Sequence, residues 1–220
     1  IKVNLNQIQN SDRTWTDNSQ NPSPPLVHAL LDQLVNRAGV SQGDITVADP
    51  SRFIADSLYY YCLADFPDVH YVDRDGGSGR EQARPDTLGT PIYYANDSVW
   101  YSGETWIASC FTEADYLINC GLLRGHNLAG LTVCAKNHFG SIWKDTVDIN
   151  DGWSPNGPDP MKHLHGWISP KDFDSWGWVF PMRPMGSYTP MPELMGHEDL
   201  GGKTMLFMVD GLYAAEHQSS

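Results

Sequence analysis

The sequence predicts an α/β fold: a mostly parallel sheet with helices on both faces, plus an irregular Trp- and Pro-rich cap region. Short apolar runs of strand type alternate with segments of helical periodicity, and acidic side chains follow several of these runs. The 220 residues can bury a sizeable core as one α/β domain. Because the chain begins at Ile1 rather than at Met, we expect an internal or processed segment of a longer chain.

The first elements have clear local signals, beginning with a strand expected over residues 2–5. Residues 23–38 are predicted to form a helix, because Ser23 suits the N-cap position and two prolines follow it. Apolar residues then recur at helical spacing until Gly39 ends the pattern. Another helix is expected over residues 53–63, and further strands over residues 45–48, 69–72, 116–118 and 205–209.

Acidic and amide side chains come directly after four of these strands. They are Asp49, Asp73, Asn119 and Asp210. Ligands of parallel sheets bind beyond the carboxyl ends of the strands, so these side chains are expected to meet at one rim. The alternative interpretation is that each residue only forms a turn or caps the following helix.

Two regions depart from the alternating pattern. Between residues 75 and 106, short aromatic runs at 92–94 and 99–101 predict an inserted hairpin. Residues 142–195 are rich in Trp, Pro, Gly and Met and show little periodicity, which predicts an irregular cap or lid over the rim. Its tryptophans could stack on a sugar or shield a cofactor, or could form a loop core in place of regular structure.

Composition restricts the partners. With 14 basic and 27 acidic residues the net charge is −13, which disfavours nucleic acid. No run approaches the about 18 apolar residues of a membrane span. The four cysteines contain no Cys-x-x-Cys pair, so no iron–sulfur cluster is expected within this chain, while disulfides and free thiols both remain open.

The stretch from His126 to Gly140 concentrates functional groups. It contains His126, Lys136 and Asn137, follows a strand-like run, and is broken by glycines where the backbone must turn. A histidine and a lysine ten residues apart can act as a proton acceptor and as an amine for covalent attachment. The competing interpretation is a helix that buries His126 and leaves Lys136 in solvent.

A second block, Asp49-Pro-Ser-Arg52, lies at another strand end. Here Asp49 could hold a hydroxyl while the Arg52 guanidinium clamps a carboxylate. If the rim is a site, Asp49 and Arg52 must lie across one cavity from His126 and Lys136. A separate pair, His163 and His165, would reach one metal ion from an extended segment, although such pairs also occur by chance.

The residues of these blocks resemble the long exported members of domain-of-unknown-function family 362. The resemblance rests on Arg124-Gly-His126, on Leu131-Thr132 and on Lys136-Asn137-His138-Phe-Gly140, and it runs from Ile1 through Val47-Ala-Asp49-Pro-Ser-Arg52 to Met208-Val-Asp210-Gly-Leu-Tyr213. It implies a bacterial protein exported to the periplasm or beyond, in many relatives through a twin-arginine signal. Some relatives also carry ferredoxin-like cysteine clusters.

A more distant resemblance is to lactate racemases that use a nickel pincer nucleotide. There too an Asp-x-x-Arg follows an early strand, and a His precedes a Gly and a Lys at the spacing of Gly130 and Lys136. The resemblance implies a metal ion or metal-containing nucleotide held by Lys136 and Gly130. Independently of it, Asn137 beside Lys136 and Asp210 at the rim are further cofactor-binding candidates. The glycine pair that precedes the lysine in the racemases is replaced here by bulkier residues.

Three functions fit these observations. The first is a cofactor- or metal-dependent enzyme acting on a small oxygenated acid at the rim, with His126 as acid or base, Arg52 as clamp, and Asp49 and Lys136 beside them. The second is a non-catalytic extracellular binding or assembly protein, which the Trp-rich region and the acidic surface would suit and which self-association would favour. The third is a redox accessory that docks an iron–sulfur partner.

Overall fold

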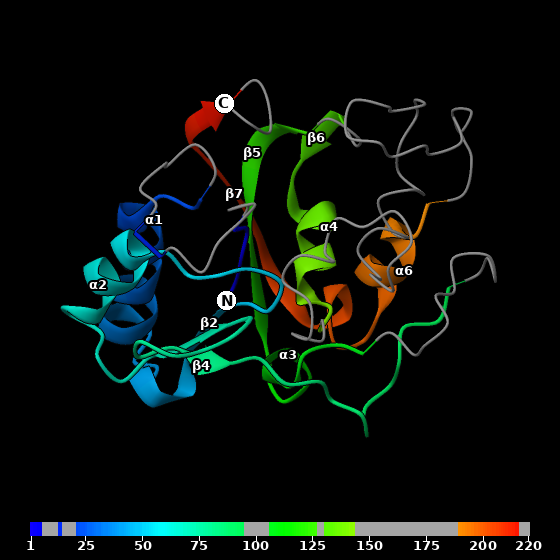
Figure 1. Ribbon diagram of the computed structural model, residues 1–220, viewed down its shortest axis with the longest axis horizontal. Coiled ribbons are helices and arrows are strands. Elements are labelled where there is room, and N and C mark those ends of the chain that lie inside the picture. The colour runs from blue at the N-terminus through cyan, green and yellow to red at the C-terminus, as the bar shows by residue number, and fades with distance from the viewer. Residues whose placement is uncertain (6–12, 15–20, 95–105, 127–129, 144–188, 216–220) are drawn as a thin grey trace.

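A computed structural model describes residues 1–5, 13–14, 21–94, 106–126, 130–143 and 189–215 of the chain (Figure 1). Its centre is one sheet with helices on both faces, as the alternating pattern predicted. The strands are β1 Lys2–Val3, β2 Thr46–Asp49, β3 His70–Asp73, β4 Glu81–Gln82, β5 Leu117–His126, β6 Gly130–Thr132 and β7 Thr204–Ala215.

The sheet is almost entirely parallel. Its order is β4-β3-β2-β1-β5, and each neighbouring pair in this series runs parallel. β7 also pairs with β5 in parallel, whereas β6 returns antiparallel to the last residues of β5. The prediction that the strands near residues 45–48, 116–118 and 205–209 belong to a parallel sheet is therefore confirmed.

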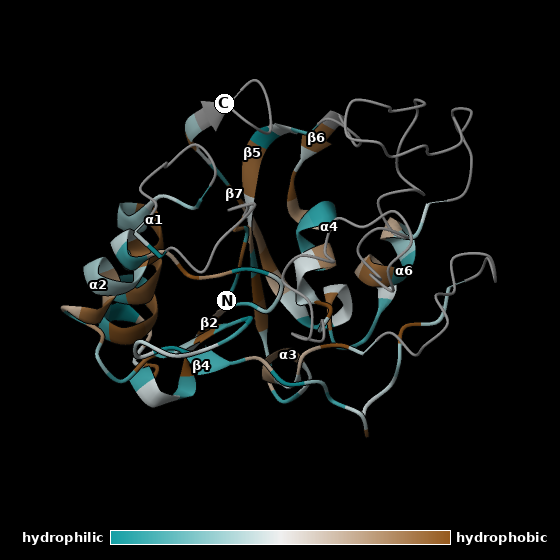
Figure 2. Ribbon diagram, in the orientation of Figure 1, coloured by the Kyte–Doolittle hydropathy of each residue, from teal (hydrophilic) through white to brown (hydrophobic). Residues whose placement is uncertain are grey.

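One face of the sheet carries α1 Pro24–Asp32, which continues as a π-helical turn to Arg37, and α2 Asp56–Leu63 (Figure 1). The expected helix over residues 23–38 is confirmed. Val27 and Leu31 of α1 are buried against Val3 and Val47 of the sheet. Figure 2 shows apolar residues concentrated along β5 and on the sides of α1 and α2 that face the sheet.

The other face carries α3 Ser109–Thr112, α4 Cys134–Asn137, a 3-10 turn η4 His138–Ser141, and α6 Met191–Gly196. Phe111, Phe139 and Leu194 from these elements form a buried cluster with Ala48 and Leu117 of the sheet. The start of α6 falls inside residues 142–195, which were expected to be irregular; residues 144–188 of that segment lie outside the described residues.

Several boundaries differ from the predictions. β5 runs to His126, so Asn119 lies within the strand and not beyond its end as expected. β7 likewise continues through Asp210. The second helix starts at Asp56, because the Ile54 amide donates to Asp73 Oδ2 at 3.0 Å and keeps residues 53–55 extended.

The inserted hairpin expected between residues 75 and 106 is not found in the described part of that segment. Residues 92–94 are not in a strand, and 99–101 lie outside the described residues. All four cysteines are free thiols. Within the described residues, no helix is both long and apolar enough to cross a membrane.

Candidate active site at the carboxyl edge of the sheet

A buried ion pair joins the ends of β1 and β2. Lys2 Nζ lies 3.0 Å from Asp49 Oδ2, and both side chains are buried. The same oxygen accepts a hydrogen bond from the Leu5 amide at 2.8 Å. Asp49 Oδ1 accepts from the amide and the hydroxyl of Ser51, at 3.1 and 2.8 Å. Both oxygens of Asp49 are therefore engaged, with Lys2 as its ionic partner.

Asn137 fastens α4 to the middle of the sheet. Its Nδ2 donates to Asn119 Oδ1 at 2.9 Å and to the carbonyls of Lys2 and Cys120 at 3.2 Å each. Its Oδ1 accepts from Lys2 Nζ at 2.9 Å. Both the oxygen and the nitrogen of the side-chain amide are thus hydrogen-bonded. Asn137 therefore holds β1, β5 and α4 together and sets the position of its neighbour Lys136.

Asn119 and His138 extend this polar network under α4. Asn119 Nδ2 donates to the Cys134 carbonyl at 3.0 Å and lies 2.9 Å from His138 Nε2. The other ring nitrogen of His138 is 3.3 Å from Ser141 Oγ. Burial, with the Lys2 charge nearby, lowers the pKa of His138 to about 3, so its imidazole is uncharged at neutral pH and serves as a structural partner.

Gly140 lets η4 close onto the loop that follows β2. A Cβ at this position would lie 2.8 Å from both Lys2 Nζ and Asp49 Oδ1, and 3.1 Å from Ser51 Oγ. These separations are shorter than ordinary van der Waals contact. The segment that carries Lys136 and the loop that carries Arg52 are thus packed against each other.

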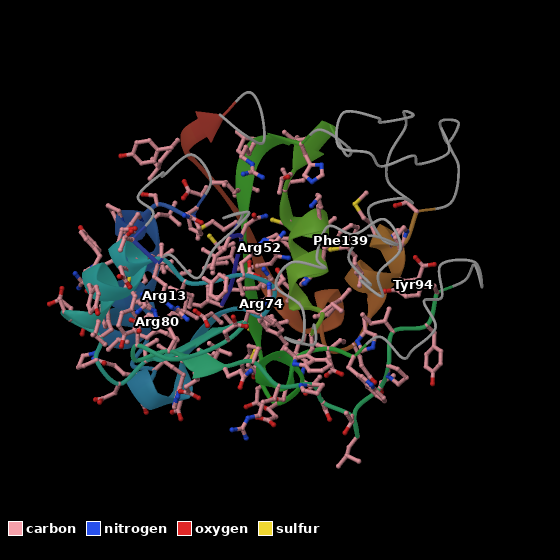
Figure 3. All side chains as sticks on the ribbon, viewed as in Figure 1. Arg13, Arg52, Arg74, Arg80, Tyr94 and Phe139 are labelled. Carbon is pink, nitrogen blue, oxygen red and sulfur yellow. The ribbon has the colours of Figure 1, made fainter. Side chains whose placement is uncertain are left out.

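Arg52 follows this loop directly. Its amide donates to the Asp49 carbonyl at 3.2 Å, and its Nη1 donates to the Ser51 carbonyl at 3.0 Å. Its own carbonyl accepts from the Arg74 amide at 3.0 Å, and the Arg74 guanidinium lies 5.8 Å from the Phe53 ring centroid. Arg52 and Arg74, labelled in Figure 3, therefore belong to adjoining loops after β2 and β3.

The Lys136 amine lies where the charges of Arg52, Arg124 and Lys2 act on it. The residue is half-buried, and its Nζ is 5.2 Å from the ring centroid of Phe139, which Figure 3 labels. Burial, together with the charges of Arg52, Arg124 and Lys2, lowers the pKa of Lys136 to about 7, although the Asp49 charge opposes this shift. About half of the amine is therefore uncharged at pH 7.

Strand β5 contributes Arg124 and His126 to the candidate site. Both are buried, and in the β5–β6 hairpin they pair with Thr132 and Gly130. Sequence reasoning did not select Arg124 as a functional residue. Its place two residues before His126 was the available signal, because alternate residues of a strand lie on the same face. We call Arg52, Arg124 and Lys136 the cationic cluster, because the charges of both arginines act on the Lys136 amine.

The remaining rim carboxylates anchor loops. Asp210 accepts from the amides of Ser23 and Leu212, at 2.7 and 3.1 Å, and so ties β7 to the start of α1. Asp73 forms an ion pair with Arg13 and accepts from the Gly76 amide at 2.8 Å. These contacts favour the interpretation that the acidic residues after the strands stabilise turns.

Metal ligands are not gathered in the described part of the chain, where no group of three or more His, Cys, Asp or Glu side chains could hold an ion. His163 and His165 lie outside it. Burial raises the pKa of the Cys62, Cys110 and Cys120 thiols to about 12, so these thiols stay protonated at neutral pH.

Comparison with protein families matches residues 1–150 to the family described as domain of unknown function (DUF362). The chain belongs to this family. The matched DUF362 region contains the whole cationic cluster, whereas α6 and β7 follow it. No curated protein and no solved structure shows a significant match to the chain. The DUF362 description includes no activity, so a function has to be argued from the site.

Proposed function

We propose that this DUF362 protein is an enzyme that binds a small oxygenated acid at the cationic cluster. The observation that carries the proposal is the gathering of Arg52, Arg124 and Lys136 at the carboxyl edge of a protein whose net charge is −13. Bringing like charges together costs electrostatic free energy, and an anionic ligand between them would recover it. The carboxyl edge is also where parallel sheets bind their ligands.

Each group has a role in this proposal. Arg52, half-buried on a loop that Asp49 and Ser51 hold, would clamp the carboxylate of the acid with two parallel hydrogen bonds. Lys136 in its uncharged form would accept a proton or attack a carbonyl carbon. His126 would act as the second acid or base. Asp49 is a positioning residue, because both of its oxygens already bind protein groups.

A metal-containing nucleotide, which the racemase resemblance implies, would use the same groups. Lys136 would be its attachment point, Gly130 would leave room for it, and the arginines would pair with its phosphate. Such a group would supply chemistry that amino-acid side chains lack. The donors around Lys136 are cations and amides, which suit an anionic group and do not suit a bare divalent ion.

The test is binding of small acids by isothermal titration calorimetry, with acetate, lactate and pyruvate as probes. We expect Arg52→Gln to weaken binding by about tenfold or more, because a charge-assisted hydrogen bond is lost. Arg84→Gln, which removes an exposed arginine outside the cluster, is the matched control and should change nothing. Equal affinities in all three proteins, or no binding of any acid, would contradict the proposal.

A second candidate, self-assembly, is favoured by one feature of β7. Among the described strands β7 pairs only with β5, and large apolar side chains on the two strands are exposed. They are Leu123, Met205, Leu206, Phe207, Val209, Leu212 and Tyr213. A continuous apolar run is typical of a strand buried on both faces. We propose that β7 pairs with the β7 strand of a second copy of the chain.

Sedimentation velocity tests the assembly candidate. If β7 mediates dimerisation, Phe207→Lys should shift the protein to the monomer, because a charge would then lie in the apolar interface. Leu88→Lys changes a side chain that is 98% exposed and lies far along the chain from β7, so it should leave the sedimentation profile unchanged. A wild-type protein that is monomeric at high concentration would exclude this candidate.

We also propose export from a bacterial cell, on the resemblance to exported relatives. Fractionation of the source organism tests this, since an antibody should detect the protein in the periplasm or the medium. Recovery only with the cytoplasmic fraction would overturn it.

A further inference from the structure

The described lysines differ in whether their amines bind other groups of the protein. Lys2 Nζ is held by Asp49 and Asn137, and Lys203 Nζ donates to the carbonyls of Phe111, Thr112 and Ala114. Both ammonium groups are saturated with protein acceptors. In the described part of the chain Lys136 Nζ has neither a hydrogen bond nor an ion pair. Its N–H groups and its lone pair are therefore available to a ligand.

The surroundings of this amine are rigid and cationic. The next residue, Asn137, is fixed by hydrogen bonds to β1 and β5, and Gly140 seats η4 on the loop that leads to Arg52. The Arg52 charge also acts on the Lys136 amine, so the two groups belong to one region of the molecule. A ligand whose carboxylate pairs with Arg52 would then hold its next carbon atom in the same region as the Lys136 amine.

We propose that Lys136 forms an imine with the carbonyl carbon of a 2-oxo acid, which makes 2-oxo acids the substrate class of the cationic cluster. This inference rests on the proposed function. In a 2-oxo acid the carbonyl carbon is bonded directly to the carboxylate carbon, so the clamp and the amine can act on adjacent atoms. A 2-hydroxy acid has no electrophilic carbon at that position.

The step balances without an oxidant or a reductant. The nitrogen lone pair forms a bond to the carbonyl carbon, and the carbonyl π electrons move to oxygen, which takes up a proton. The nitrogen loses a proton to give the carbinolamine. The carbinolamine hydroxyl group then takes up one further proton, for which His126 is the proposed acid, and leaves as water, so that a protonated C=N bond remains. The products are the iminium ion and one water molecule, and the iminium ion is an electron sink for chemistry at the neighbouring carbons.

The protonation state of Lys136 supports this step. An ordinary lysine is almost entirely charged at neutral pH, whereas burial lowers the pKa of Lys136 to about 7. The fraction of uncharged amine is raised roughly a thousandfold over a free lysine at pH 7. Desolvation beside other cations is a recognised way to activate a lysine nucleophile.

The experiment is reductive trapping with pyruvate. The full chain is incubated with pyruvate and cyanoborohydride near neutral pH, digested, and analysed by mass spectrometry. We expect the reduced pyruvyl adduct on Lys136 to form at least about tenfold faster than on Lys203, which serves as an internal control in the same sample. Lactate with the same reductant should give no adduct, and Arg52→Gln should slow trapping on Lys136 by about tenfold.

The outcomes separate the two proposals. Acid binding in calorimetry without trapping on Lys136, or with equal trapping on Lys203, overturns the imine and leaves the proposed function in place. Absence of both binding and trapping overturns both. Because the comparison between Lys136 and Lys203 is made in the unmodified protein, it does not depend on the folding of any variant.

Discussion

Among single residues, Lys2 and Asp49, which form a buried ion pair, should affect the candidate site most when they are substituted. Burial lowers the pKa of Lys2, while the Asp49 charge opposes this shift, so the ammonium group depends on its carboxylate partner. The pair also fixes Ser51, which precedes the proposed clamp Arg52. A change at Asp49 therefore acts on stability first and on ligand binding through the loop.

We expect Asp49→Asn to lower the free energy of unfolding by about 3 kcal/mol, because it leaves a buried ammonium group without a counter-charge. Asp65→Asn is the matched control, since Asp65 pairs with His28 and its side chain is 68% exposed. It should cost less than about 0.5 kcal/mol. Urea unfolding of both variants measures the difference, and similar midpoints for the two would contradict the structural role of Asp49.

Substitution of Lys136 should change stability in the opposite direction and make the protein more stable. The pKa of Lys136 is near 7 in the folded protein and 10.5 as the ordinary value, so the folded state binds fewer protons between these limits and stability rises with pH there. Below pH 7 the penalty of the buried charge is complete. We expect Lys136→Met to stabilise the protein by about 1 kcal/mol at pH 6 and by progressively less toward pH 10.

Thermal unfolding at several pH values measures this gain. A Lys203→Met variant is the comparison, because Lys203 holds three carbonyls and its loss should destabilise the protein at every pH. A Lys136→Met protein less stable than the wild type at pH 6 would mean that the amine has a structural role.

Residue spacing selected segments that the structure packs together, but it did not predict how their side chains pair. Arg52 and Lys136 were both selected from their strand-end blocks, and the structure brings their segments together through Gly140. Nothing in the sequence pattern indicated the ionic partner of Asp49. It is Lys2, which comes near only because β1 lies beside β2 in the sheet, and strand order is not encoded in local periodicity.

At the scale of elements, η4 and the loop after β2 meet with no space between them. Gly140→Ala would place a methyl group 2.8 Å from Lys2 Nζ and Asp49 Oδ1. We expect this variant to lose about 2 kcal/mol of stability and to bind acids more weakly, because η4 and the Arg52 loop must move apart.

Gly43→Ala is the control for that variant, since nothing lies within 4 Å of its added methyl group. It should leave the unfolding free energy within about 1 kcal/mol of the wild type. Chemical denaturation and calorimetry of both proteins provide the comparison, and an unaffected Gly140→Ala protein would show that the two segments do not pack as described.

The length of β5 shows why element boundaries were harder to predict than element types. The apolar run near residues 116–118 predicted a short strand, since Asn119 and two glycines interrupt the pattern. In the structure Asn137 and His138 satisfy the Asn119 amide, and Gly121 admits the backbone of α4 at a distance where a Cβ would be 2.9 Å from Cys134 N. These partners lie outside any local sequence window.

At the scale of the whole molecule, β1 joins two halves of the sheet. β2, β3 and β4 lie on one side of it, and β5 with β6 and β7 on the other. The fold class was predictable because alternating apolar runs and helices have few parallel arrangements. The central place of β1 was not, because a two-residue strand carries almost no periodic signal.

This arrangement predicts that a change in β1 loosens both halves at once. Val3 is fully buried, and Val3→Ala should lower stability by about 2 kcal/mol. In hydrogen exchange, the amides of β2 and β5 should lose protection by similar factors, while Leu88→Ala at an exposed loop position should change neither. Loss of protection in β2 alone would show that the halves are stable independently.

The contact between Lys2 and Asn137 spans 135 residues of chain, which has a consequence for synthesis on the ribosome. At usual elongation rates, on the order of ten seconds separate the emergence of these two residues. Throughout that interval β1, β2 and β3 can already pair, but the edge of β1 that later receives β5 stays open to other strands. The nascent chain is therefore expected to need a chaperone during this interval, and slow translation of the segment between β3 and β5 should lower the yield of folded protein.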